Sequence, residues 1–163
     1  RAVANLVGTA ITGTFTSLTG PSYAENASGD VGTGTIILNA PAGFVFDTAG
    51  AAPTVRITRL SGSGGAANNI NDLASGTAAA MTSVTSTQLV FTVTSSSMNG
   101  VTCSLTWQNV RVRPTAGTPL ATGYLRMSGT ASVVGLSTNA NLGTLREVAG
   151  AASTLSKNAL FAS

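Results

Sequence analysis

Alternation of apolar and polar residues is strongest in the middle of the chain. Two segments, residues 88–94 and 101–107, each have one apolar face and one face rich in hydroxyl groups, as expected of half-buried strands. Between them, Asn99-Gly100 supplies the residues that a type I′ turn requires. We therefore predict a β-hairpin over residues 88–107, with inward side chains Leu89, Phe91, Val93, Val101, Cys103, Leu105 and Trp107.

Shorter segments of the same kind occur along the rest of the chain. They predict strands at Thr35–Leu38, Phe44–Phe46, Thr54–Leu60, Asn109–Arg113, Gly123–Ser128, Thr130–Val134 and Gly143–Val148. With one Lys and two Glu in the sequence, there is little scope for helical i,i+4 charge pairs. The pattern predicts an all-β fold, an Ig-like two-sheet β-sandwich, with a jelly roll as the alternative. Residues 61–80 are polar and predict a long loop.

The two ends of the chain have no hairpin partner beside them in sequence. Residues 3–18 fit one long strand with Val7, Ile11 and Phe15 on a single face, and the tail carries Leu155 and Phe161 at even spacing. Each end is either an internal sheet edge or a strand given to a neighbouring subunit. We therefore divide the chain into an N-terminal arm (1–17), a β-sandwich domain (18–150) and a C-terminal arm (151–163).

Composition restricts the chemistry that is available. The 163 residues include eight Lys+Arg, five Asp+Glu and no His, so a Ser-His-Asp triad and the usual Cys/His zinc site are excluded. One Cys allows no intrachain disulfide. The cations are scattered, unlike the clusters that bind nucleic acid, and no apolar run is long enough for a membrane helix. The chain begins with Arg1 rather than Met, and we expect export after removal of a leader.

Three segments of the sandwich region carry a resemblance to known proteins. They are LTGPSY at 18–23, GDVGTGTIILNAPAGF at 29–44 and GVTCSLTWQNVRVRP at 100–114. These segments, within residues 18–150, resemble Ig-like β-sandwich repeat domains of large secreted bacterial surface and adhesin proteins. The resemblance implies an extracellular, non-enzymatic role in structure or adhesion, with no catalytic motif to transfer.

Candidate site residues are few, and each has a simpler structural interpretation. The acids Asp30 and Asp47 lie beside turns, so a catalytic pair of carboxylates is not expected. Two tyrosines, Tyr23 and Tyr124, are possible stacking platforms for sugars, whereas Trp107 has the parity of the core. A polar loop is a possible calcium or ligand site but is more simply a turn rich in amides; it contains Asn68, Asn69, Asn71 and Asp72.

Two side-by-side cations, Arg111 and Arg113, fit either a site for an acidic partner or an exposed face that blocks edge pairing. Taken together, the sequence predicts an extracellular structural protein that forms a bacterial fibre or surface layer by β-strand addition between identical subunits. The arms would supply the inserted side chains: Val7, Ile11, Phe15, Leu155 and Phe161. The alternative is a carbohydrate-binding or adhesin module of a larger protein. No cofactor, metal or nucleic acid is expected.

Overall fold

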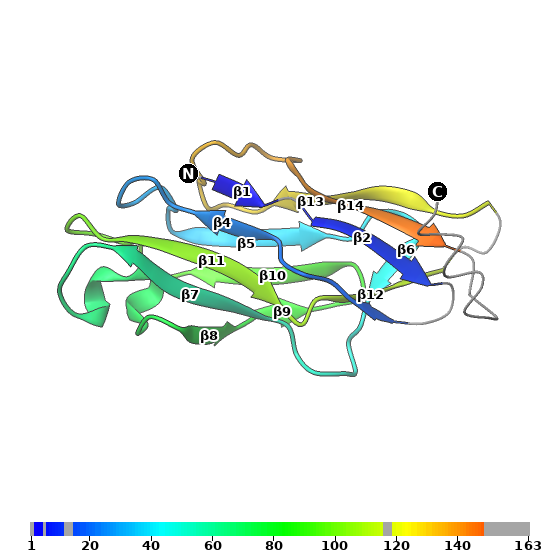
Figure 1. The fold of residues 1–163 in the computed structure, drawn as a ribbon, viewed down its shortest axis with the longest axis horizontal. Coiled ribbons are helices and arrows are strands. Elements are labelled where there is room, and N and C mark those ends of the chain that lie inside the picture. The colour runs from blue at the N-terminus through cyan, green and yellow to red at the C-terminus, as the bar shows by residue number, and fades with distance from the viewer. Residues whose placement is uncertain (1, 5, 12–14, 116–118, 149–163) are drawn as a thin grey trace, which may run out of the picture.

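The computed structural model describes residues 2–4, 6–11, 15–115 and 119–148, and it is an all-β sandwich, as the sequence predicts (Figure 1). One sheet has five strands in the order β1 (Ala2–Ala4), β4 (Ser22–Ala24), β11 (Thr102–Gln108), β7 (Thr54–Ser61) and β8 (Thr77–Ala80). The other has six strands in the order β2 (Leu6–Ile11), β14 (Asn141–Val148), β13 (Thr122–Ser128), β5 (Gly34–Asn39), β10 (Gln88–Val93) and β9 (Ser83–Val84). The predicted C-terminal arm, with Leu155 and Phe161, lies outside the described residues.

A small third sheet covers one end of the sandwich. Its order is β3 (Thr16–Ser17), β12 (Arg111–Pro114) and β6 (Phe44–Phe46). The predicted loop 61–80 holds two short 3-10 turns, η1 (Ala66–Asn68) and η2 (Ile70–Asp72), and ends in β8. Within the described ranges, no helix has the length and apolar character needed to cross a membrane.

Inward-facing side chains from both large sheets form one core. The period of two along each strand selects them: in β13, Leu125 and Met127 are buried, while Tyr124 and Arg126, which alternate with them, are exposed. Trp107 packs edge-on against Phe91, with ring centres 6.4 Å apart. The apolar faces of residues 88–94 and 101–107 therefore point into the core, as predicted.

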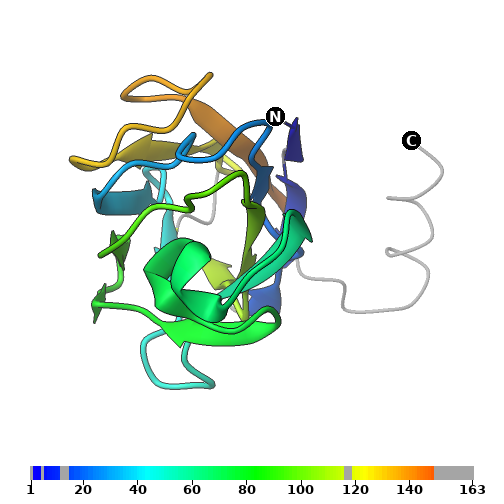
Figure 2. The same cartoon turned by 90° about the vertical axis from the view of Figure 1, so that its left-hand side faces the viewer.

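The N-terminal residues close one long side of the sandwich. Strand β1 pairs antiparallel with β4 in one sheet, and β2 pairs parallel with β14 in the other. Figure 2 shows this dark-blue segment along one side of the molecule. On the opposite side, β8 and β9 likewise belong to different sheets. Residues 2–4 and 6–11 are therefore internal sheet edges of the described chain, one of the two alternatives that the sequence left open.

Two predicted elements are wrong. The 88–107 hairpin does not exist, because β10 and β11 lie in opposite sheets. The Asn99-Gly100 turn forms, with φ values of 55° and 79°, but residues 94–98 separate β10 from it and hydrogen-bond to the 68–71 loop. The predicted strand Thr130–Val134 is a loop with two isolated bridges, from Val133 to Val31 and from Val133 to Leu136.

Candidate functional site

The outer face of the six-stranded sheet carries a hollow of about 480 Å³, within the size range of small-ligand sites. Strands β5 and β13 form its floor, and the loop after β5 forms one wall. Tyr124 is the aromatic group of this hollow and is 45% exposed. The lining residues are Asn39, Ala40, Pro41, Ala42, Gly123, Tyr124, Arg126, Ser128 and Asn139.

Hydrogen bonds within the chain hold the polar side chains of this hollow in place. The carbon at the centre of the Arg126 guanidinium lies 5.2 Å from the Tyr124 ring centre, and the guanidinium donates to the Asn139 carbonyl at 2.9 Å. The Asn39 amide nitrogen donates to the Arg126 carbonyl at 3.0 Å and to Ser128 Oγ at 2.9 Å. Gln88 donates to Asn39 Oδ1 at 3.0 Å. The network therefore spans β10, β5 and β13 and orders the site before any ligand arrives.

A close backbone approach forms the wall beside Tyr124. A Cβ atom on Gly123 would lie 2.5 Å from Pro41 Cβ, so only glycine lets the Pro41 loop sit against β13 at this point. Gly123 directly precedes Tyr124 in β13. The contact between Gly123 and Pro41 therefore sets how close the Pro41 loop lies to the Tyr124 ring.

A second hollow, of about 500 Å³, continues from the first. It lies within the β13–β14 connection and is lined by residues 127–138. Ser128 borders both hollows. Because the two hollows meet at Ser128, a chain-like ligand can contact both.

All five acids of the chain lie elsewhere. Glu25 and Glu147 are buried, with exposures of 5% and 1%. Asp30 accepts hydrogen bonds from the backbone of its own loop, Asp72 accepts from Ser95, and Asp47 pairs with Arg111. None of the five lines either hollow, so the site has positive but no negative charge.

The 68–72 loop uses its polar side chains for its own conformation. Asn71 Oδ1 accepts from the Thr94 backbone at 2.7 Å, and Asn71 itself has a positive φ of 57°. Asn69 Oδ1 accepts from Arg59 Nε at 2.7 Å, and Asn68 Oδ1 accepts from Asn99 at 2.8 Å. The amide-rich turn is therefore the arrangement observed, and the described residues hold no cluster of three or more acidic or cysteine side chains suited to a metal ion.

Tyr23 is not a surface platform, which corrects the sequence-based expectation. The side chain is 3% exposed and lies in the core, and its hydroxyl donates to the Val134 carbonyl at 2.6 Å. Of the two predicted stacking tyrosines, only Tyr124 is exposed to solvent.

The predicted anchor residues of the N-terminal arm that the structure describes lie beside segments of their own chain. Val7 and Ile11 lie in β2, in register with Thr144 and Val148 of β14. The Phe15 ring centre lies 5.8 Å from the Arg111 guanidinium carbon and 5.3 Å from that of Arg113.

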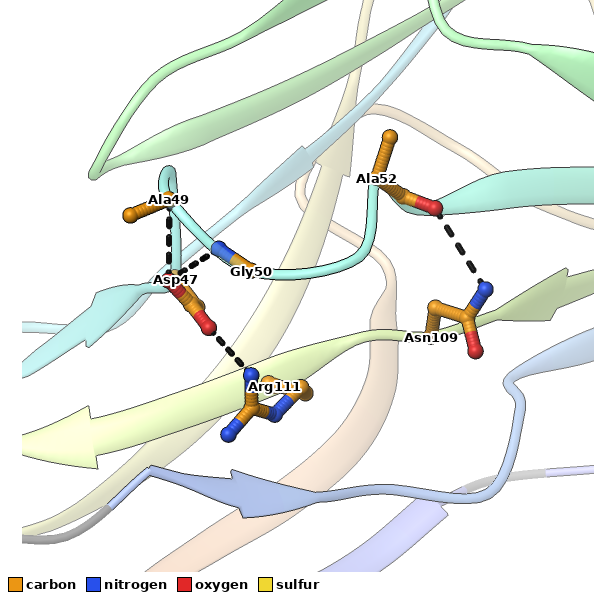
Figure 3. Close-up of polar contacts among 6 residues, drawn as sticks. All are labelled: Asp47, Ala49, Gly50, Ala52, Asn109 and Arg111. Carbon is orange, nitrogen blue, oxygen red and sulfur yellow. Dashed lines mark hydrogen bonds and ion pairs between the residues drawn. The ribbon is translucent and has the colours of Figure 1, made fainter.

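Arg111 is further fixed by Asp47, as Figure 3 shows. The backbone N–H groups of Ala49 and Gly50 hydrogen-bond the Asp47 carboxylate, and together with Arg111 they lower its pKa from the ordinary value of 3.8. Asn109, on the same side of the loop, donates to the Ala52 carbonyl at 3.4 Å. This cluster ties the 47–52 loop to β12 and leaves Arg111 engaged within its own chain.

Sequence reasoning found Tyr124 but missed its neighbours. Arg126 and Ser128 share the face of Tyr124 at a spacing of two, which is a signal readable from the sequence. Asn39 and Asn139 come from distant segments, and only the pairing of β13 with β5 and the path of the β13–β14 loop bring them to the ring.

Comparisons with protein-family models, curated proteins and solved structures give no match for this chain.

Proposed function

We propose that this chain is an extracellular, non-enzymatic binding module that holds a saccharide on the outer face of its six-stranded sheet. The observation that carries the proposal is the hollow around Tyr124. An exposed aromatic ring packs against the apolar C–H face of a sugar, and nearby fixed donors and acceptors hydrogen-bond its hydroxyl groups. Asn39, Ser128 and Arg126 provide such groups around this ring.

The placement of the N-terminal residues also favours a binding module over a fibre subunit. A donated strand requires a subunit whose own edge is open. Here β1 and β2 already occupy the edges beside β4 and β14, so the chain completes that side of its sandwich without a neighbour.

Binding of the chain to a glycan array containing neutral and acidic oligosaccharides tests this function. We expect binding that Tyr124→Ala abolishes or weakens at least tenfold, while Tyr124→Phe, which keeps the ring, retains most of it. Leu60→Ala is the matched control, because Leu60 is similarly exposed at 50% but lies in β7 of the five-stranded sheet, outside both hollows. An array without any bound glycan would contradict the proposal, as would full binding by Tyr124→Ala.

Self-assembly by strand addition is the second candidate, and the composition of β2 favours it. This six-residue strand lies at the end of its sheet. Charged residues and proline usually protect an edge strand from further pairing, and β2 contains neither. Electron microscopy of the full chain and of a variant lacking residues 1–16 tests the idea. We expect polymers only from the full chain; polymers from both, or from neither, would contradict addition through this segment.

A further inference from the structure

We propose that the saccharide held by this face is acidic, a polysaccharide carrying carboxylate or sulfate groups that Arg126 and Arg146 bind on either side of Tyr124. The inference rests on the proposed function and narrows its ligand class. It comes from the distribution of charge over the whole six-stranded sheet, not from the hollow alone.

The two arginines flank the ring on neighbouring strands. Arg126 follows Tyr124 by two residues, on the same exposed face of β13. Arg146 lies in β14, where its cross-strand partner is Thr122, while Tyr124 pairs with Thr144. Arg146 is therefore a diagonal neighbour of Tyr124, at about 7–8 Å, a distance that long side chains span.

Both guanidinium groups have donors left for a ligand. An arginine has five N–H donors, and Arg126 uses one N–H-bearing nitrogen for the Asn139 carbonyl. The Arg146 side chain is exposed and makes no hydrogen bond or ion pair with residues 15–115 or 119–148. A carboxylate or sulfate accepts two such N–H groups side by side, the strongest form of hydrogen bond open to arginine.

No acid competes for these groups on this sheet. Glu147 is the sole Asp or Glu in its six strands, and it is 1% exposed, with Oε1 accepting from the Ala121 backbone at 2.9 Å. The face therefore has uncompensated positive charge around an aromatic platform, which favours an anionic sugar over a neutral one.

The five-stranded sheet provides the contrast. It also has two arginines and no acid on its strands, but its guanidinium groups are engaged by the chain itself. Arg59 donates to Asn69 Oδ1 and to the Gly64 and Gly65 carbonyls at 2.7–2.8 Å. Arg56 donates to Gln108 Oε1 and to the Gly76 carbonyl. Equal numbers of arginines on the two sheets thus leave different capacity for a ligand.

Isothermal titration of the full chain with defined hexamers tests the inference. The probes are hexagalacturonate for carboxylate, a chondroitin sulfate hexamer for sulfate, and fully methyl-esterified hexagalacturonate and cellohexaose as neutral sugars. We expect an acidic hexamer to bind at least tenfold more tightly than either neutral one, with an affinity that falls as NaCl rises from 50 to 500 mM. The acidic hexamer that binds identifies the anion.

Variants separate the charge from the platform. We expect Arg146→Gln to weaken the acidic hexamer about tenfold, which corresponds to about 1.4 kcal/mol, and to leave any neutral binding unchanged. Arg113→Gln, on β12 beside Phe15, removes the same charge away from this face and should change neither. Because the Arg146 side chain makes no hydrogen bond or ion pair with residues 15–115 or 119–148, its variant should melt at the wild-type temperature.

The outcomes distinguish this inference from the function on which it rests. Equal or better binding of neutral hexamers that still depends on Tyr124 would overturn the acidic ligand and keep the binding module. Acidic binding that Arg113→Gln weakens as much as Arg146→Gln would also overturn it, as a general charge effect. Absence of binding by every hexamer and every array glycan would overturn both.

Discussion

Replacement of Glu25 by glutamine tests how a buried carboxylate joins β11 to two loops of the sandwich. The carboxylate is 5% exposed and accepts three hydrogen bonds: at Oε1 from Ser97 Oγ at 2.7 Å and from the Cys103 backbone at 2.9 Å, and at Oε2 from the Val31 backbone at 3.1 Å. The Glu25 side chain thus links β11 to the loop that contains Val31 and to the loop that contains Ser97. Glutamine keeps the length and shape but turns one acceptor oxygen into an NH2 group.

The geometry sets the expected cost. In the better orientation the amide oxygen keeps Ser97 and Cys103, and its NH2 group faces the Val31 N–H, which is fully buried. An unsatisfied buried donor costs about 1–3 kcal/mol, and the two remaining bonds lose their charge assistance. The smaller desolvation cost of a neutral amide offsets part of this. We expect Glu25→Gln to lower the free energy of unfolding by about 2–3 kcal/mol and the melting temperature by about 5–10 °C.

Urea unfolding followed by Trp107 fluorescence measures this loss. The transition midpoint should fall with an unchanged slope. Asp72→Asn is the control, because Asp72 is exposed and its single contact with Ser95 Oγ survives the change; it should stay within about 0.5 kcal/mol of wild type. A loss below about 0.5 kcal/mol for Glu25→Gln would refute the reasoning that this carboxylate is a required acceptor.

Three further predictions concern the wall of the hollow, an ion pair and the single thiol. Gly123→Ala should destabilise by about 1–3 kcal/mol in the same urea assay and weaken saccharide binding, because its Cβ would meet Pro41 Cβ at 2.5 Å; wild-type values for both would contradict the contact. The pKa of Asp47 is lowered in the folded chain, chiefly by the Ala49 and Gly50 N–H groups. The Asp47 carboxylate therefore adds to the free energy of unfolding above pH 3.8, and this stabilisation is lost as the pH falls through the lower folded pKa. Melting curves from pH 6 to pH 2 should therefore fall less steeply for Asp47→Asn than for wild type, and parallel curves would contradict this. Burial raises the pKa of Cys103, which is fully buried, so iodoacetamide at pH 8 should label it only in urea; rapid labelling of the folded chain would show an accessible thiol.

The sequence predicts the class of fold because strand period and turn residues are local properties. Residues 88–93 and 102–108 are strands with the predicted inward side chains. Their pairing is not local: the type I′ turn at 99–100 forms, yet the five residues before it bind the 68–71 loop and lead the chain to the other sheet. A turn signal therefore fixes the backbone at two residues but not the partner of the strand that enters it.

Tyr23 and Glu25 illustrate the same limit at the site. Strand β4 has only three residues, too few for a period to be recognised, so Tyr23 was expected at the surface and no buried role was predicted for Glu25. Once β4 is placed between β1 and β11, both side chains lie on its buried side. Tyr124, in contrast, lies in a seven-residue strand with Leu125 and Met127 as clear inward neighbours, and its exposure follows from the sequence.

Chemical-shift mapping locates the ligand on the molecule and thereby decides whether the outer face of the six-stranded sheet binds it. A titration of the ¹⁵N-labelled full chain with the tightest-binding acidic hexamer should shift the backbone amide signals of Asn39, Tyr124 and Arg126, with saturation, and leave those of Arg56 and Thr58 on the other sheet unmoved. Shifts centred on the five-stranded sheet, or no saturable shift on β5 and β13, would contradict the assignment of the outer face of the six-stranded sheet as the binding surface.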